Sequence, residues 1–342
     1  MTISRAGDTE RVHHVRDGAV DDLPSPTREV QRGIRERRDA SHLDRIPQAS
    51  TYLAFLAGVH TPSLNVDAAR DKAAQTKLDA VRDAFSGPYV VDGAQVTARP
   101  MFRMFHPKPD AIVATVGACA ARAGVPPWPA IVGQCTPAQL VKLSQALIDA
   151  GCLPPGPGDA AARIRRMQWD YGIGVDCAGY SKLAIAATAA RAPEMYGPGW
   201  ESFRDLDGKR IGSFMRLSIV DARPGDLVTL DPIPPERYGH NVVVYSRSTA
   251  ETSHKALLAA KYGPEVAAFL ASVGPHHVFE VDSSWGAGAE GDPCGGFRRD
   301  TWIYDASANM WGSFEPRTTP PRFQISARGP AGDAYHGTYR PR

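Results

Sequence analysis

The sequence has no long run of hydrophobic residues. Its opening segment, Met1 to Asp8, lacks the apolar stretch of a secretory signal peptide, and no later run approaches the length of a membrane span. We therefore expect no membrane span. We also expect a protein that is cytoplasmic when made and that reaches any target outside the cytoplasm by a non-classical or injection route.

Cysteine is scarce, and its pattern lacks any close pair. The five cysteines are odd in number and far apart in the chain: Cys119, Cys135, Cys152, Cys177 and Cys294. This spacing indicates neither a disulfide framework nor a zinc ribbon. A single pair, such as Cys119 with Cys135, stays open.

The sequence also lacks a large excess of positive or negative charge. Charged residues make up 22% of the chain and the formal net charge is +2, so nothing indicates a nucleic-acid surface or a strongly acidic substrate. Hydrophobic residues, at 43% of 342, are enough to bury a core. We expect a globular protein with no nucleic-acid partner.

What the sequence does contain is one cysteine in a distinctive setting. In Tyr171-Gly-Ile-Gly-Val-Asp-Cys-Ala-Gly-Tyr-Ser181, a Gly-rich segment gives way to residues 178–190, which are rich in helix formers and contain no proline. Cys177 is therefore predicted to lie at a helix N-terminus, where unpaired N–H groups and the helix dipole favour the nucleophilic thiolate. The competing interpretation is a small buried hydrophobic residue.

The first part of the chain is predicted to be accessory. Residues 1–46 are polar and rich in Arg and Asp, and they are predicted to form a mobile arm. Residues 47–155 have a mostly helical pattern, with one helix ending near residue 85 and another starting at Thr136-Pro137, and they are predicted to form an accessory or pro-region. The Pro- and Gly-rich segment 152–158 is the expected domain boundary.

The second half of the chain changes from a helical period to a strand period. Short strands are predicted at 227–230, 240–246, 278–284 and 296–304, with a helix inserted at 250–274. A leading helix followed by strands indicates an α+β fold, with the nucleophile helix packed on an antiparallel β-sheet. The domain is expected to span 156–318, and the Gly-, Pro- and Arg-rich residues 319–342 are expected to be a loosely ordered tail.

A nucleophilic cysteine needs a base that takes its proton. His240 is the best candidate, because it begins a β-branched strand immediately after a proline-rich turn. For His254, His276 and His277 we favour the interpretation of an exposed or capping histidine.

The base in turn needs a group that orients it. Glu280, Asp282 and Ser284 share one face of the strand at 278–284, because strand side chains alternate. Asp282 is the first choice for this orienting role and Glu280 the second. An ordinary surface carboxylate is the alternative for either residue.

These residues occur in an order that resembles a known family. Asp176-Cys177-Ala178-Gly179-Tyr180 is similar to the Asp-Cys-Ser-Gly-hydrophobic signature of the NlpC-type cell-wall cysteine peptidases, which are papain-like α+β proteins. In that family the cysteine helix is followed by a Pro-Gly-Asp-Leu turn and then by a strand that starts with the catalytic histidine. Pro224-Gly-Asp-Leu227 and Gly239-His-Asn-Val-Val-Val-Tyr245 stand here in the same order.

The resemblance covers about residues 160 to 315 and departs from the family at three points. Ala178 replaces the usual serine. The third catalytic position is usually histidine in the family, so Asp282 would be a variant. The tyrosine that helps to hold the oxyanion has only Tyr171 or Trp169 as imperfectly spaced counterparts.

The resemblance implies hydrolysis of amide bonds in peptidoglycan peptides, with no metal and no cofactor. Cys177 would attack the carbonyl carbon, His240 would take and return the proton, and water would release the acyl-enzyme. The N–H of Cys177 and the Tyr171 hydroxyl would hold the oxyanion. A secretion apparatus or an immunity protein is the expected protein partner if the chain is a delivered antibacterial effector.

Two other functions stay open. The same residues could serve a deamidase, transamidase or acyltransferase that acts on another amide, because related folds host several acyl-transfer reactions. Alternatively, the domain could be a binding module without catalytic activity. The helical first half could also cover the cleft as a pro-region.

Overall fold

The computed structural model of the protein describes residues 49–103, 108–156, 159–189, 214–233, 239–250, 252–286, 295–315 and 322–341. The chain divides into two compact units, Met1–Ser63 and Leu64–Arg342. The sheet and the candidate site lie entirely within the second unit. The predicted arm at 1–46 and Cys294 lie outside the described residues.

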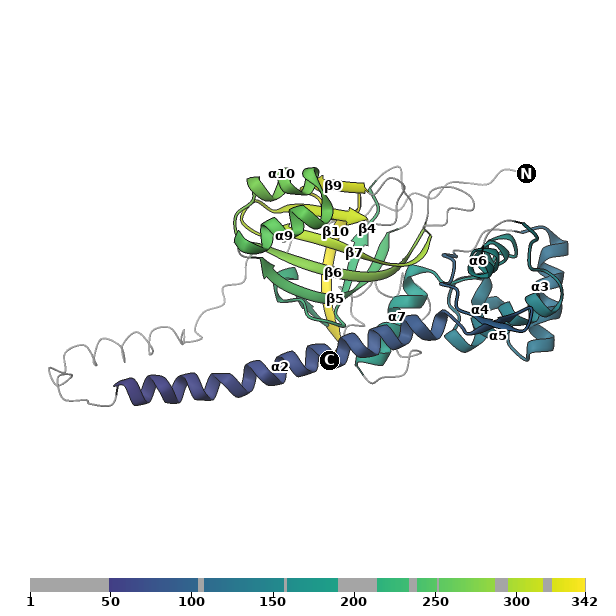
Figure 1. Ribbon diagram of the computed structural model, residues 1–342, viewed down its shortest axis with the longest axis horizontal. Coiled ribbons are helices and arrows are strands. Elements are labelled where there is room, and N and C mark those ends of the chain that lie inside the picture. Colours follow the sequence, from purple (N-terminus) through teal and green to yellow (C-terminus); the bar gives the residue numbers. More distant parts are fainter. Residues whose placement is uncertain are drawn as a thin grey trace, which may run out of the picture. The chain divides into compact units, whose positions relative to one another are not determined.

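Helices and one hairpin make up the first part of the second unit (Figure 1). A long helix, α2 (Ala49–Phe85), enters this unit and ends where the sequence predicted. The elements that follow are β1 (Tyr89–Val91), β2 (Ala94–Val96), α3 (Asp110–Ala123), α4 (Trp128–Ile131), α5 (Pro137–Asp149) and α6 (Ala160–Asp170). The β1–β2 hairpin and α6 are additions to the predicted elements.

The start of α5 confirms its sequence signal. The Thr136 hydroxyl accepts a hydrogen bond from the Gln139 N–H at 3.3 Å, and the Gln139 side chain accepts one from the Thr136 N–H at 2.9 Å. This reciprocal capping box satisfies two backbone donors that a helix start leaves without partners. The helix then buries Leu140 and Leu143, so local capping and tertiary packing agree on its position.

An eight-stranded antiparallel sheet forms the second part, with α7 (Cys177–Thr188) packed against two of its strands. The strand order is β3-β10-β4-β5-β6-β7-β8-β9. The strands are β3 (Phe214–Leu217), β4 (Leu227–Asp231), β5 (His240–Ala250), β6 (His276–Trp285), β7 (Gly296–Asp305), β8 (Met310–Glu315), β9 (Arg322–Ser326) and β10 (Ala334–Pro341). The predicted α+β class and the antiparallel sheet are confirmed.

The sheet is curled (Figure 1). Strands β8 and β10 stand far apart in the strand order, yet the ring centroids of Trp311 and Tyr335 are 5.4 Å apart. The Ala331 N–H also donates to the Ser313 hydroxyl at 3.0 Å. One face of the sheet is therefore concave, and it encloses a cluster of apolar side chains to which Trp302 and Trp311 belong.

The prediction of a loosely ordered tail is wrong. Strand β10 lies inside the sheet, between β3 and β4, and Tyr339 on it is fully buried. The overall composition of the tail, rich in Gly, Pro and Arg, conceals a run of Tyr335, Thr338 and Tyr339 that supplies a strand with side chains to bury. The sheet needs this strand because β3 and β4 both pair with it.

The helix predicted at 250–274 is two helices. α9 (Thr252–Tyr262) and α10 (Pro264–Ser272) are separated by Gly263, whose φ of 94° lies in the left-handed region that favours glycine. Pro264 follows as the first residue of α10, where its missing N–H costs little. These helices cover the outer face of the sheet near Val278 and Ile303.

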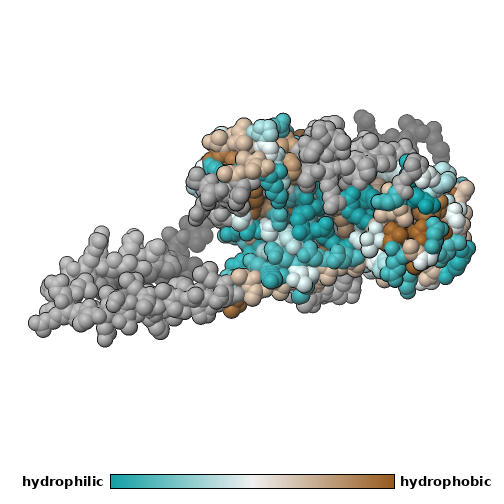
Figure 2. Space-filling model, viewed as in Figure 1, coloured by the Kyte–Doolittle hydropathy of each residue, from teal (hydrophilic) through white to brown (hydrophobic). Residues whose placement is uncertain are grey.

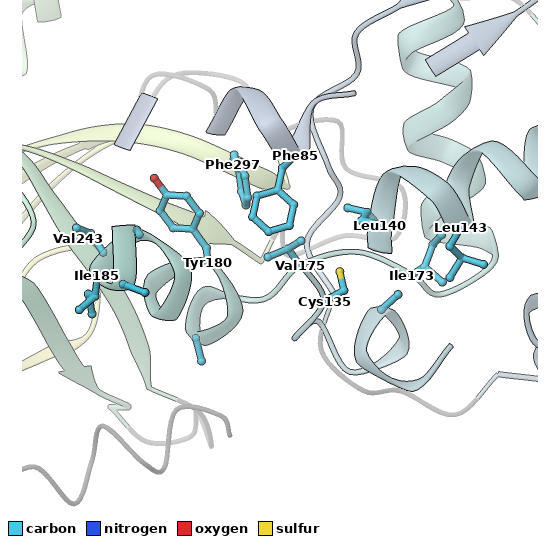
Figure 3. Close-up of a cluster of buried hydrophobic side chains, with 14 of the residues drawn as sticks. Phe85, Cys135, Leu140, Leu143, Ile173, Val175, Tyr180, Ile185, Val243 and Phe297 are labelled. Atoms are coloured by element: carbon cyan, nitrogen blue, oxygen red, sulfur yellow. The ribbon is translucent and has the colours of Figure 1, made fainter. Parts of the chain in front are cut away.

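A single hydrophobic cluster joins the helical part to the sheet (Figure 3). The ring centroids of Phe85 and Phe297 are 5.1 Å apart and those of Tyr180 and Phe297 are 4.6 Å apart, so α2, α7 and β7 meet there. The same cluster contains Leu140 and Val243, which lie on opposite sides of the predicted boundary at 152–158 in the chain. The two sides of this segment therefore share one core.

The outer surface is largely polar. Figure 2 shows mostly hydrophilic residues over the sheet and a hydrophobic area over the helical part. Trp128 of α4 is a 59%-exposed large side chain in the helical part. Among the helices described, none has the length and apolar character needed to cross a bilayer. The predicted absence of a membrane span agrees with this finding.

Candidate active site

Cys177 is the first residue of α7, as the sequence predicted. Asp176 is the N-cap, and its side chain accepts a hydrogen bond from the Gly179 N–H. A side-chain oxygen at the N-cap is what a helix start requires, because its first backbone N–H groups have no partners within the helix. The local sequence Asp-Cys-Ala-Gly therefore fixes the position of the thiol along the chain.

A turn from the helical part holds this helix start in place. The Gln134 amide donates to both carboxylate oxygens of Asp176 at 2.8 Å, and the Asp176 N–H donates to the Gly133 carbonyl at 2.9 Å. A side chain on Gly179 would meet that carbonyl, since a Cβ there would lie 2.1 Å from the Gly133 oxygen. Gln134 thus belongs to the site, although the sequence analysis did not single it out.

Val175, the residue before the N-cap Asp176, is hydrogen-bonded to the sheet. The Ser284 hydroxyl on β6 donates to the Val175 carbonyl at 2.7 Å, and the Arg103 N–H donates to the same oxygen at 3.1 Å. Arg103 itself is almost fully buried. The Cys177 segment is therefore anchored from the helical part and from β6 together.

His240 is the first residue of β5 and lies on the concave face of the sheet. Its ring stacks on Trp285 with centroids 3.8 Å apart and an interplanar angle of 23°. Neighbours on this face include Val242 and Val244, which belong to the enclosed apolar cluster. Among the described residues, the His240 Nε2 atom has no hydrogen-bond partner.

The Cys177 thiol lies beside the start of β5. The backbone of Asn241, the residue after His240, hydrogen-bonds to the Cys177 thiol. The Cys177 thiol does not, however, hydrogen-bond to His240 Nε2. The structure thus places the thiol beside the backbone that follows His240. The imidazole lies with Val242 on the concave face, whereas α7 packs with Val243 on the other face, and the bond that proton transfer needs is not formed.

Burial governs the ionisation of both side chains. Cys177 is 5% exposed, and burial, followed by the charge of Asp176, raises the pKa of its thiol to about 12. Burial, followed by the charge of Arg298, lowers the pKa of His240 to about 3. The resting pair is therefore a thiol and a neutral imidazole. The expected thiolate is absent because the cost of burying a charge exceeds the stabilisation offered by the helix N-terminus.

Asp176 is also affected by burial. Burial raises the pKa of its carboxyl group to about 7, against the opposing effect of the hydrogen bonds from Gly179 and Gln134. Near neutral pH the Asp176 side chain therefore exists in both protonation states, directly beside Cys177.

Asp282 is not placed with His240. Its carboxylate accepts two hydrogen bonds from Arg299 at 2.8 Å, and Arg82 lies 3.6 Å away. Asp282 pairs with Val243, three residues beyond His240, so its side chain points from the opposite face of the sheet. We expected Asp282 to orient the histidine, and the structure joins it to Arg299 instead.

Glu280, Tyr171 and Trp169 lie away from the thiol. Glu280 pairs with Ser246, six residues along β5 from His240, and accepts a hydrogen bond from its hydroxyl at 3.0 Å. The pKa of Tyr171 is raised to about 12, first by its hydrogen bond to Cys152. The Trp169 indole lies beside Lys108, whose Nζ is 5.8 Å from the ring centroid. The structure gives none of these three side chains a contact with Cys177.

The other candidate histidines that the structure describes lie at the far end of β6 from Trp285. His276 and His277 begin β6, at the end of the strand opposite Trp285, and His276 Nδ1 lies 3.0 Å from the Gly274 carbonyl. The side chain of His254 lies outside the described residues. No group of three or more His, Cys, Asp or Glu side chains suited to a metal ion occurs within the described ranges.

The residues around His240 that the sequence analysis missed are Trp285 and Arg298. The guanidinium of Arg298 lies 4.5 Å from the Trp285 ring centroid and is paired with Asp300. The available signal was the alternation of Arg298, Asp300 and Trp302 on one face of a strand.

Comparison with known proteins gives no assignment. No family model, no curated protein and no solved structure matches the chain.

Proposed function

We propose that the protein is a cysteine hydrolase that cleaves amide bonds in peptidoglycan peptides, with Cys177 as nucleophile and His240 as base. The observation that carries this proposal is the contact of a capped helix N-terminal thiol with the backbone next to His240. The order of the motifs and the packing of α7 on an antiparallel sheet support a papain-like arrangement.

The resting state of the pair fixes how the reaction starts. Because neither group is charged, the thiol proton passes to His240 as the sulfur attacks the carbonyl carbon, rather than before substrate binds. His240 then gives the proton to the leaving amine, and water hydrolyses the thioester. The backbone N–H of Cys177 is the oxyanion donor in this scheme. The His240 ring must move toward the thiol for the first step.

The test is digestion of purified peptidoglycan, with the released muropeptides identified by mass spectrometry. Cys177→Ala and His240→Gln are expected to reduce release by about 10³-fold or more, because each removes a member of the reacting pair. Cys152→Ala is the matched control, since Cys152 is a half-buried cysteine in the helical part, and it is expected to retain wild-type activity. Equal release by wild type and Cys177→Ala would overturn the proposal.

A second candidate is a binding module without catalytic activity. The observation that favours it is the burial and neutrality of both Cys177 and His240. It predicts that wild type and Cys177→Ala sediment equally with peptidoglycan while neither releases fragments. Transfer of the acyl group to an added amine, with Cys177 required, would instead indicate a transamidase or acyltransferase.

The proposal includes delivery as an antibacterial effector, with a secretion apparatus or an immunity protein as partner. It rests on the sequence resemblance alone. A tagged protein that stays in the cytoplasm under all conditions would contradict this part of the proposal and leave the enzymatic part untouched.

A further inference from the structure

The inner face of the sheet holds a line of stacked and charged groups that starts at His240. Trp285 on β6 stacks against His240 from β5 on one side and lies under the Arg298 guanidinium of β7. Strand β6 runs between β5 and β7, so Trp285 contacts the imidazole from one neighbouring strand and the guanidinium from the other. This arrangement lies on the concave face, away from the Asp282–Arg299 pair.

The ion pair at the end of this line is buried. The side chains of Arg298 and Asp300 are 5% and 0% exposed, and Arg298 Nε donates to both carboxylate oxygens at 2.8 and 2.9 Å. A buried ion pair offers little net stability, because removing two charges from water costs about as much as their attraction returns. We therefore attribute to the Arg298–Asp300 pair a role other than stabilising the fold.

We propose that Arg298, anchored by Asp300, is the positioning residue for His240: it holds the Trp285 indole in place as the platform on which the imidazole lies. This inference rests on the proposed function, because it assigns the orienting role that the sequence analysis gave to Asp282. A guanidinium stacks well on an indole face, and a flat platform restricts the tilt of an imidazole.

The charge of Arg298 also acts on His240. Burial is the first cause that lowers the pKa of His240, and Arg298 is the second. Within the described ranges, the charged groups on this side of β7 are Arg298, which acts on the imidazole, and Asp300, which pairs with Arg298. Trp285 and Ser283 of β6 and Leu230 of β4 do not titrate. Removing the guanidinium should therefore raise the pKa of His240.

The test measures that pKa by NMR titration of the full chain with labelled histidine, with His240→Gln to assign the resonance. Arg298→Gln is expected to move the His240 titration upward by about one pH unit. Arg299→Gln is the matched control, because its side chain lies on the other face of β7 and pairs with Asp282. The control is expected to leave the His240 titration unchanged.

A second variant covers the risk that an unpaired Asp300 prevents folding. Arg298→Gln with Asp300→Asn leaves a neutral hydrogen-bonded pair and still removes the guanidinium, so the same upward direction is expected. An unchanged His240 titration in the folded variants, or an equal change in Arg299→Gln, would overturn the inference.

The failure of the inference and the failure of the proposed function give different results. If the wild type releases no muropeptide but the His240 titration responds to Arg298→Gln, the proposed function is wrong and the positioning contact stands. If the wild type is active and the titration does not respond, only the positioning role is wrong.

Discussion

At the scale of the residue, burial sets the chemistry of the site. Folding raises the pKa of Asp176 and lowers the pKa of His240, because burial disfavours the charged form of each side chain. The raised pKa of Asp176 contributes stability that is complete below about pH 4 and is lost as the pH rises through about 7. The lowered pKa of His240 contributes stability that is complete above about pH 6.5 and is lost as the pH falls toward 3.

Asp176→Asn separates these two effects. Asparagine caps a helix as well as aspartate and does not ionise, so the variant should lack the loss of stability between pH 5 and pH 8, which is about 2 kcal/mol in the wild type. Urea unfolding at pH 5 and at pH 8 measures this loss of stability. Asp159→Asn, at the N-cap of α6, is the matched control. An identical pH dependence in wild type and Asp176→Asn would show that burial does not perturb this carboxyl group.

At the scale of the element, the start of α7 depends on close backbone approach. Gly179 lies against the Gly133 carbonyl, so the helix can pack on the turn before Gln134 only if residue 179 has no side chain. This contact sets how closely the first turn of α7 approaches the turn at Gly133. The helix start that carries Cys177 is thus positioned by a turn more than forty residues earlier in the chain.

Gly179→Ala tests this packing. The added methyl group would overlap the Gly133 oxygen and is expected to destabilise the protein by about 3 kcal/mol and to displace the helix start. Gly117→Ala in α3 is the control, because nothing lies within 4 Å of its added Cβ. The control should stabilise the protein by up to about 1 kcal/mol, since alanine favours a helix over glycine. Thermal unfolding of both variants measures their stabilities. Equal stability of Gly179→Ala and Gly117→Ala would contradict the close approach of Gly179 to the Gly133 carbonyl.

At the scale of the whole molecule, the last strand completes the sheet. β10 pairs with both β3 and β4 and buries Tyr339 and Thr338, so the sheet is incomplete without residues 334–341.

Two truncations are expected to differ. Removal of residues 1–63 should leave a cooperative thermal transition at an unchanged midpoint, because the second unit keeps its own core. Removal of residues 331–342 should abolish the transition, because β3 and β4 lose their shared neighbour. Circular dichroism during heating distinguishes the two. A folded protein without residues 331–342 would mean that β10 is dispensable.

The sequence by itself determined the features that depend on neighbouring residues. The start of α7 at Cys177, the capping box of α5 and the β4, β5, β6 and β7 strands were predictable, because caps, turns and strand propensity act over a few residues. The α+β class followed from their order. The tail and α6 were missed because composition was given more weight than the pattern of large side chains.

Only the tertiary structure decided the surroundings of Cys177 and His240. Both faces of β5 are apolar, with Val242 on one and Val243 on the other, so the sequence could not tell on which face His240 lies. The sheet curl and the register of β6 decided that Trp285, rather than Asp282, lies beside it. Ionisation followed from the same packing, since desolvation depends on what surrounds a group in three dimensions rather than on its neighbours in the chain.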